Sequence, residues 1–332
     1  MNLTEHQDVS GIHSNFSCLK TSTTATDVLL YTAVSVVVSL TVCGNLLVII
    51  SICHFKQLQT PTNFLLLSLA MTDFLVGVFV MPLYFTMLIE PQRCFGMVLC
   101  TIFNFAAFHL TSVSIYNVTL IAVDRWFALS NPLHYSMKMT VNVTLRLVSI
   151  LWLTSFIYTM VLLYFNGNID NAKVNITCSE CVVVLDDVWA TVDFILVFVV
   201  SCSMIIIIYL RIFAIARNHA KKIRSVQKSQ KTNTDSTASE RKAAKTLGVL
   251  VAVFLLCLVP SFVCTFFDAY ISNEAVQLAV SITMTLLYLN SSINPVIYAL
   301  FYPWFKTSVK LILTLKICDT ESSVWNVLEK ET

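Results

Sequence analysis

The chain is 332 residues long; 57% of its residues are hydrophobic and only 12% are charged. A soluble domain carries about 25% charged residues to cover its surface. The composition therefore excludes a soluble domain and predicts a protein whose surface lies largely in lipid. A formal net charge of +2 gives no reason to expect nucleic acid as a partner.

Residues 1–27 are predicted to form an extracellular N-terminal segment. They contain Glu5 and Asp8 but lack an apolar core of about 7–15 residues, so no cleaved signal peptide is expected. Sequons at Asn2 and Asn15 lie in this segment, and a third at Asn175 lies in a later external connection. All three are predicted N-glycosylation sites.

Seven stretches are long and apolar enough to cross a bilayer, whose core of about 30 Å needs about 20 residues of helix. They predict an all-α membrane protein with a seven-transmembrane helix bundle over residues 28–300, because backbone in lipid must satisfy its own hydrogen bonds. Pro82, Pro260 and Pro295 are expected to kink these helices. The stretches are 28–54, 63–88, 98–129, 145–165, 188–212, 243–268 and 276–300.

The distribution of basic residues predicts the orientation. If the N-terminus is outside, only Lys20, Arg93 and Lys173 of the 21 Lys and Arg residues lie outside, and the richest basic block, residues 211–245, lies inside. The C-terminus is then cytoplasmic. The external connections are acidic, which either steers cations toward the bundle or only keeps the loops soluble.

Asp73 in the second stretch is informative, because ionisable groups at membrane depth are costly and usually functional. Oxygen-rich groups around one carboxylate predict a site for a small hard cation, here sodium. The alternative is a water-filled hydrogen-bond cluster around a protonated carboxyl group. Apart from this ion no cofactor is predicted. The polar residues expected around Asp73 are Asn45, Ser114, Asn290, Ser291 and Asn294.

Asp124 and Arg125 end the third stretch at its cytoplasmic face. Arg125 can pair with Asp124 and with Glu240, near the start of the sixth helix, and loss of the second contact would free that helix to move. The alternative is an arginine that only anchors its helix at the membrane surface. His109, higher in the same stretch, has no companion at metal-ligand spacing and is interpreted as a polar lining residue.

Asp193 lies about two turns into the fifth stretch, and no Lys or Arg occupies the outer half of any stretch. A carboxylate without a protein partner predicts an anchor for a cation from outside, to which Phe108, Phe262 and Tyr288 could add cation–π attraction. The alternative is a hydrated structural Asp near a helix N-terminus, where the helix dipole tolerates it.

Three cytoplasmic segments complete the organisation. Residues 218–240 are polar and are predicted to form a mobile third cytoplasmic loop. Residues 301–318 have the amphipathic pattern of a short eighth helix on the inner leaflet, with membrane lipid as its partner. Cys318 follows it and is a candidate for palmitoylation, although an unmodified cysteine fits equally well. Residues 319–332 are expected to form a cytoplasmic tail.

Taken together, these motifs resemble the rhodopsin-like family of G-protein-coupled receptors over nearly the whole chain. Three further segments look like the trace amine-associated receptors, especially those of fish: His54 to Asn63, Val80 to Pro82 and Asn290 to Phe305. The general motifs are Gly44-Asn45, Leu69 to Asp73, Cys100, Asp124-Arg125-Trp126, Trp152, Tyr209, Phe254-x-x-Cys257-x-x-Pro260 and Asn294 to Tyr298.

The resemblance implies disulfides Cys100–Cys181 and Cys18–Cys178, whose pairing could be exchanged. It also implies a Gs or olfactory-type heterotrimeric G protein, with receptor kinases and arrestin as further partners, and location in the plasma membrane, including olfactory cilia. The pocket it implies is lined by Ala107, Phe108, Thr111, Asp193, Phe262, Thr265 and Tyr288. Its switch residues are Asp124, Arg125, Tyr209, Glu240, Phe254, Pro260 and Tyr298.

Three positions depart from the family pattern. Ala107 stands where aminergic relatives carry the amine-binding Asp, so the anchor is expected to have moved to Asp193 in the fifth helix. Leu258 replaces the Trp two residues before Pro260, and Ser201 replaces the proline of the fifth helix. These two replacements leave the activation route open.

Three other functions compete. A transporter would need internal repeats, and none is visible among seven spans. An intramembrane enzyme would need paired catalytic groups at one depth, whereas Asp73 and Asp193 lie at different levels. A receptor of the same fold for a non-amine ligand stays open, with Ala107 in its favour and Asp193 against it.

Overall fold

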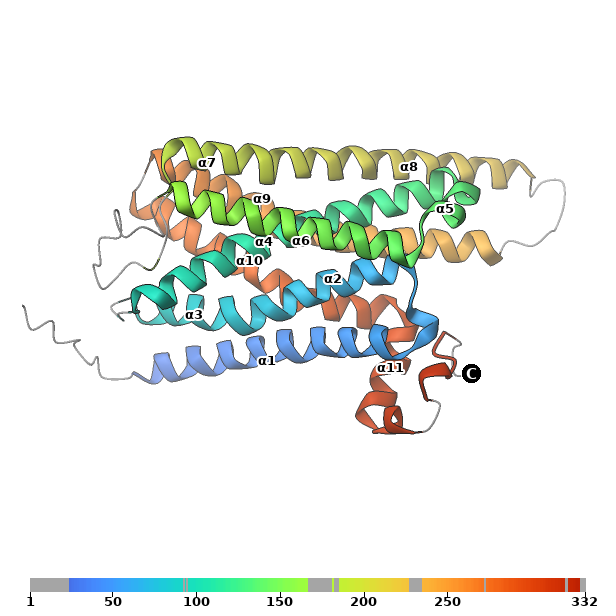
Figure 1. Ribbon diagram of the computed structural model, residues 1–332, viewed down its shortest axis with the longest axis horizontal. Coiled ribbons are helices and arrows are strands. Elements are labelled where there is room, and N and C mark those ends of the chain that lie inside the picture. Colours follow the sequence, from blue (N-terminus) through green and yellow to red (C-terminus); the bar gives the residue numbers. More distant parts are fainter. Residues whose placement is uncertain are drawn as a thin grey trace, which may run out of the picture.

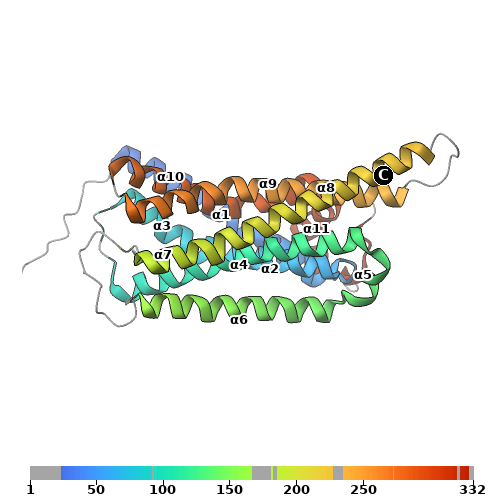
Figure 2. The same ribbon diagram turned by 90° about the horizontal axis from the view of Figure 1, so that it is seen from above.

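The computed structural model describes residues 24–319 and 322–328, apart from 92, 94, 167–180, 182–184, 227–234 and 272. In this part of the chain seven helical spans lie side by side along one long axis (Figures 1 and 2), and no strand occurs among the described residues. The predicted all-α seven-helix bundle is confirmed. We call the end where α1 begins the N-terminal end of the bundle, and the opposite end, where α11 lies, the C-terminal end.

Two of the seven spans are each divided by a π-helical turn, and two short helices, α5 and α11, lie outside the spans. The elements are α1 (Ala25–His54), α2 (Pro61–Leu75), α3 (Met81–Ile89), α4 (Met97–Ser130), α5 (Pro132–Lys138), α6 (Val141–Phe165), α7 (Asp187–Asp193), α8 (Val200–Val226), α9 (Asp235–Tyr270), α10 (Glu274–Phe301) and α11 (Pro303–Leu313).

The helices begin a few residues before the predicted apolar stretches, because capping residues precede those stretches. Thr24 and Asp27 form a capping box at the start of α1, and Thr60, Thr140 and Asn273 each accept a hydrogen bond from a backbone N–H of the first turn that follows. These side chains satisfy donors that the helix itself leaves unpaired.

Two π-helical turns, Val76–Val80 and Phe194–Val199, interrupt the second and fifth spans. The first precedes Pro82, which cannot donate a backbone hydrogen bond, so the local pattern has to shift. The second begins directly after Asp193 and has no proline within it. Such turns are frequent at functional sites, which draws attention to Asp193.

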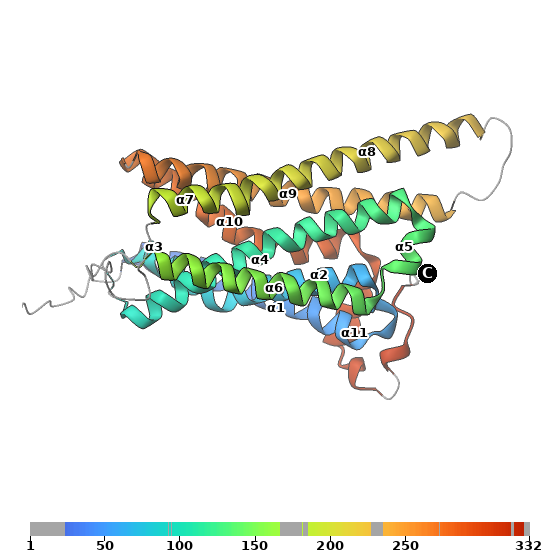
Figure 3. The ribbon, with the colours of Figure 1, turned by 45° about the horizontal axis from the view of Figure 1, so that its top comes forward.

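The helices on either side of the predicted 218–240 loop are longer than expected. The backbone is helical to Val226 at the end of α8 and again from Asp235 at the start of α9, and α8 projects beyond the rest of the bundle (Figure 3). Ala220, Lys221, Lys222 and Arg224, in the last part of α8, favour helix even outside the membrane. Residues 227–234, between these helices, lie outside the described residues.

Packing is tightest where α1 meets α10. A Cβ atom on Gly44 would lie 2.8 Å from the Cβ of Pro295, so this approach requires glycine. The amide of Asn45 donates to the backbone oxygen of Ser291 at 3.0 Å. This contact holds the first helix against the kinked part of α10.

The described C-terminal segment, residues 322–328, lies against the end of α1 and the turn at Lys56–Leu58 that joins α1 to α2. The Ser322 hydroxyl is 3.0 Å from Nε2 of His54, and the Val327 N–H donates to Oε1 of Gln57 at 3.2 Å. Val327 is fully buried. The predicted tail is therefore seated on the bundle over these residues.

Candidate functional site

A polar cluster surrounds Asp73 in the middle of the bundle. Asp73 is fully buried; Ser291 donates to its Oδ1 at 2.8 Å and Asn294 to its Oδ2 at 2.6 Å. The side-chain oxygens of Asn45, Asn290 and Asn294 are buried without a hydrogen-bond partner among the described residues. Carboxylate and amide oxygens are ligands that a hard cation prefers, so the chemistry of these residues fits a sodium ion.

The structure brings Asp73 together with two of its predicted partners, Ser291 and Asn294, through direct hydrogen bonds. Asn45 instead bonds the backbone of Thr41 and Ser291. No described hydrogen bond links Ser114 or Asn290 to Asp73. Their place in a cation site stays a prediction.

Asp193 lies at the junction of α7 and the π-helical turn, nearer the N-terminal end. It is half-buried, and its Oδ1 accepts a hydrogen bond of 2.9 Å from the hydroxyl of Tyr158 on α6. The described residues show no ion pair between Asp193 and a basic side chain. The carboxylate therefore has one neutral donor and no counter-ion within the described structure.

Aromatic rings join the fifth and sixth spans beside Asp193. Phe194, the next residue, stacks on Phe266 with ring centroids 4.3 Å apart. One turn further, Phe198 stacks on Phe262 at 5.0 Å with an interplanar angle of 9°. Four phenylalanines thus form a continuous apolar surface next to the carboxylate. Such a surface suits the apolar part of a ligand and can attract a cation.

The other residues predicted to line a pocket are dispersed. Tyr288 is buried and its ring packs edge-on against Tyr84, with centroids 4.8 Å apart. Phe108 and Thr111 on α4 are half-buried, whereas Thr265 on α9 is exposed. No described hydrogen bond or ring contact connects these residues to Asp193. Ala107 packs beside the apolar cluster that contains Phe85 and Phe103.

A second ionic cluster lies at the C-terminal end of the bundle. Arg125 forms an ion pair with Asp124 and a hydrogen bond to the hydroxyl of Thr62. Asp124 also accepts from Thr62 at 2.9 Å and from Tyr135 on α5 at 2.8 Å. The predicted Arg125–Asp124 pair is present, and Thr62 and Tyr135 are partners that the sequence did not indicate. The Glu240 side chain lies outside the described residues.

Two tyrosines lie within electrostatic reach of Arg125. They are Tyr209 on α8 and Tyr302, which follows α10. Burial raises the pKa of Tyr302 to about 12, so its phenol is neutral and its oxygen can only accept a hydrogen bond from a guanidinium group. This end of the bundle thus gathers polar groups from several spans around one arginine.

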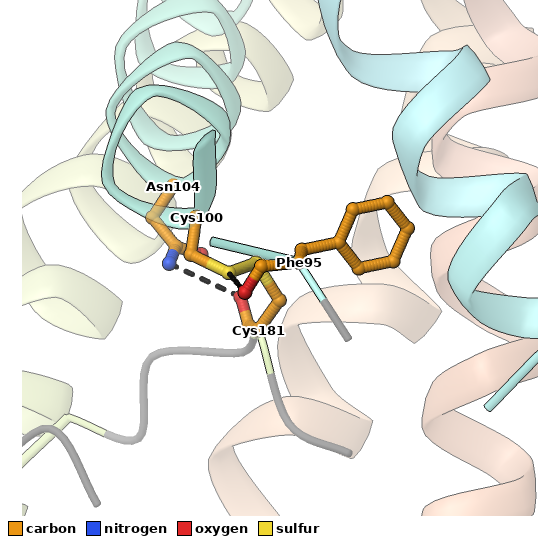
Figure 4. The surroundings of a disulfide bond; sticks show 4 residues. All are labelled: Phe95, Cys100, Asn104 and Cys181. Atoms are coloured by element: carbon orange, nitrogen blue, oxygen red, sulfur yellow. Dashed lines mark hydrogen bonds between the residues drawn. A yellow bond between two sulfur atoms is a disulfide. The ribbon is translucent and has the colours of Figure 1, made fainter. Parts of the chain in front are cut away.

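Near the N-terminal end a disulfide joins Cys181 to Cys100 on α4, with Cα atoms 5.2 Å apart (Figure 4). Asn104, one turn along α4, donates to the backbone oxygen of Cys181 at 3.1 Å. The two contacts fix residue 181 over the start of α4. The second predicted pair, Cys18 and Cys178, and the sequons Asn2, Asn15 and Asn175 lie outside the described residues.

Comparison with known proteins agrees with this architecture. Residues 44–298 match the family "7 transmembrane receptor (rhodopsin family)". The chain is 38% identical to trace amine-associated receptor 13c of Danio rerio over 322 residues, covering 94% of each chain. It is 38% identical to trace amine-associated receptor 7d of Mus musculus over 297 residues, covering 87% of this chain and 83% of the relative.

The chain belongs to the trace amine-associated receptors of the rhodopsin-like family. It is therefore a G-protein-coupled receptor and a multi-pass protein of the plasma membrane, and not an enzyme. The competing interpretations as a transporter or an intramembrane enzyme, which the sequence already disfavoured, are thereby set aside.

Several residues around the proline of α9 complete the receptor's core. Phe254 and Leu258 are buried, as are Ile115 on α4 and Tyr298 on α10. Leu258 occupies its position as an ordinary apolar core residue, which explains how the bundle closes without a tryptophan there. Ser261, next to Pro260, has its hydroxyl 3.3 Å from the sulfur of Met284, a contact that links α9 to α10.

His109, predicted to be a polar lining residue, contacts the fourth span. Its Nδ1 lies 3.1 Å from the hydroxyl of Ser155 on α6, and its ring contacts Phe105, Trp152 and Phe156. No metal-like cluster of His, Cys, Asp or Glu occurs among the described residues. His109 therefore serves the contact between the third and fourth spans.

Tyr158 is a further site residue that sequence reasoning missed, although a signal for it existed. Tyr158 lies seven residues before the end of α6 at Phe165, and Asp193 lies six residues after the start of α7 at Asp187. The two helices run in opposite directions, so similar distances from their facing ends imply similar depth. Matching polar residues by depth would have paired them.

Proposed function

We propose that this receptor senses an extracellular amine whose ammonium group pairs with Asp193, and that it activates a heterotrimeric G protein of the Gs or olfactory type. The observation that carries the proposal is the half-buried Asp193 carboxylate, which has a neutral donor in Tyr158 and no described counter-ion. A cation from outside would neutralise that charge. The names of the relatives, trace amine-associated receptors, support the same ligand class.

The proposed pocket combines this charge with apolar rings. Phe262 stacks on the fifth span beside Asp193, and Phe108, Thr111, Thr265 and Tyr288 belong to the proposed lining. The ammonium group would bind the carboxylate while the rest of the molecule lies on the rings. With Ala107 in the third span unable to bind a cation, the ligand's charged end points toward the fifth span.

The proposal places the N-terminal end of the bundle outside the cell and the C-terminal end inside. The basic residues outside the spans gather at the C-terminal end, and α11 carries Lys306 and Lys310 beside buried Trp304 and Phe305. Such a helix suits the inner leaflet. Cys318, exposed just after it, is the proposed acylation site. Olfactory cilia as the location, and kinases and arrestin as further partners, belong to the same proposal.

Sodium is the proposed allosteric ion at Asp73, held there by the carboxylate with Ser291, Asn294, Asn290 and Ser114. A bound monovalent cation would neutralise Asp73 and link the second, third and seventh spans. Asp73 and Ser291 would then be held in the resting arrangement of α2 and α10. An agonist that prefers another arrangement would bind less well.

Activation requires only that the amine prefer the active arrangement. Arg125 is held by Asp124 and Thr62, contacts that we assign to the resting arrangement, and Glu240 is the proposed further partner on the sixth helix. Release of Glu240 would let α9 swing away and admit a helix of the G protein between the C-terminal ends of α4, α8 and α9.

A receptor for a non-amine ligand is the second candidate. Tyr158 already donates to one oxygen of Asp193, which is what a purely structural carboxyl group would show. The two candidates differ in one respect: only an amine receptor needs the charge of Asp193 for its response.

The test expresses the receptor with a cAMP reporter and applies phenethylamine, hexylamine and putrescine. Asp193→Ala is expected to abolish the amine response at unchanged surface level, because the ion pair is lost. Asp187→Ala is the matched control, since Asp187 is an exposed acid in the first turn of the same helix. An unchanged response in Asp193→Ala would end the anchor proposal.

A further inference from the structure

The fourth and fifth spans are fastened to each other near the N-terminal end by two polar contacts. The Tyr158 hydroxyl donates to Oδ1 of Asp193 at 2.9 Å. About two turns further on, the side-chain oxygen of buried Asn166 accepts from the backbone N–H of Asp186 at 2.9 Å. Together they set both the position and the rotation of α7 against α6, so the Asp193 side chain is held in a fixed direction.

The groups that act on the Asp193 carboxylate are phenols. Tyr158 from α6 bonds it directly, and Tyr116 from α4 lies within electrostatic reach of both. His109, the nearest imidazole on α4 to this level, faces Ser155 instead. None of the described Lys or Arg side chains forms an ion pair with Asp193.

A phenol is well suited to this position. It donates one hydrogen bond, which stabilises a carboxylate relative to the carboxylic acid, yet it carries no charge that would compete with an ammonium ion. A Lys or Arg here would neutralise Asp193 permanently, and a Phe would leave it free to rotate and easier to protonate. The Tyr158 bond occupies Oδ1, and no hydrogen bond to Oδ2 is found among the described residues.

We propose that Tyr158 is a positioning residue for amine recognition: its hydroxyl holds the Asp193 carboxylate in the direction and the charge state in which the second oxygen can receive the ammonium group. This inference rests on the proposed amine function. It adds a residue of the fourth span that controls amine affinity without itself having to contact the ligand.

Loss of the hydroxyl has two expected effects. A hydrogen bond to a charged group contributes about 1.5–3 kcal/mol, so Tyr158→Phe should weaken amine binding by about 10- to 100-fold. It should also move the pH dependence of binding. Amine potency falls in acid as Asp193 takes up a proton. Without the Tyr158 donor the carboxylate should take up that proton at a pH about one unit higher, because the charged form has lost a stabilising hydrogen bond.

The experiment measures phenethylamine, hexylamine and putrescine binding to full-length receptor in lipid nanodiscs between about pH 5.5 and 8, where alkylamines remain charged. Wild type, Tyr158→Phe and Asp193→Ala are compared, with Tyr164→Phe as matched control, because Tyr164 is an exposed tyrosine of the same helix. Tyr158→Gln, which keeps a donor, and Tyr158→Leu, which does not, form a second pair if the Phe variant expresses poorly.

Weaker binding of Tyr158→Phe with its acid limb displaced to higher pH, and a Gln variant stronger than the Leu variant, would support the inference. Wild-type behaviour of Tyr158→Phe beside a silent Asp193→Ala would overturn it and leave the amine function intact. Equal losses in the Gln and Leu variants without a pH displacement would assign Tyr158 to helix packing alone and also overturn it. A fully active Asp193→Ala would remove both proposals together.

Discussion

The two halves of the bundle are held together by different interactions. From the middle of the bundle toward the C-terminal end, side-chain hydrogen bonds connect the helices, as at Asp73 with Ser291 and Asn294 and at Asp124 with Thr62. Toward the N-terminal end, the fifth and sixth spans meet through stacked rings, beside hydrogen bonds such as the one between Tyr158 and Asp193. Hydrogen bonds are short and directional, whereas ring contacts tolerate sliding. The half that would meet a ligand can thus adjust by small displacements of its rings. In the half that would meet a G protein, the hydrogen bonds between helices are either formed or broken.

The largest expected effect concerns the close contact between α1 and α10. Gly44→Val should prevent α1 from approaching α10, because even one Cβ atom would lie 2.8 Å from the rigid ring of Pro295. Overpacking costs about 1–3 kcal/mol, which in a marginally stable membrane protein should remove most of the receptor from the cell surface. Surface labelling measures this loss. Gly96→Ala is the control, since nothing lies within 4 Å of a Cβ there; equal surface levels for both variants would contradict the packing argument.

A substitution among the stacked rings of the N-terminal half should instead change which amines the receptor prefers. Phe262→Ala removes the partner of Phe198 and should raise the half-maximal concentration of phenethylamine about tenfold, equivalent to about 1.4 kcal/mol. Putrescine, which has no ring, should lose less. Phe267→Ala on the same helix is exposed and serves as control. Equal losses for both amines would show that the stack does not form the apolar wall.

Changes at Asp73 should alter the effect of the proposed sodium ion on agonist affinity. Agonist affinity of wild type, measured in sodium chloride and in choline chloride, is expected to differ by about five- to tenfold, near the lower end of usual coupling energies. Asp73→Asn should abolish that difference, because it removes the charge but keeps the shape. Thr41→Val, which breaks the neighbouring contact with Ser292, should preserve it. A sodium effect that persists in Asp73→Asn would place the ion elsewhere.

The smallest expected effect concerns the C-terminal end. Thr62→Val removes a hydroxyl that bonds both Asp124 and Arg125, and the loss of about 1 kcal/mol should raise agonist-independent cAMP about two- to fivefold per surface receptor. Thr62→Ser keeps the hydroxyl and should behave as wild type. If both variants signal alike, Thr62 does not restrain Arg125.

The sequence predicted the spans well because the physical demand behind them is simple: lipid requires long apolar helices, and capping residues such as Thr60 and Asn273 mark where they start. It also pointed to the contacts of Asp73, because few polar residues exist at that depth. The π-helical turns were not predictable, since an apolar run such as Phe194–Val199 carries no local mark of its hydrogen-bond register. Tyr158 was overlooked because a tyrosine in an apolar helix is usually an ordinary packing residue.

The seating of residues 322–328 has a practical consequence for labelling. With Ser322 beside His54 and Val327 buried against the turn at Lys56–Leu58, a fluorescent protein fused close behind this segment would strain it or pull it away. The signal of a reporter placed there would then reflect a receptor from which the fusion itself has displaced residues 322–328. A long flexible spacer after the last residue, or an epitope at the opposite terminus, would leave the seat undisturbed.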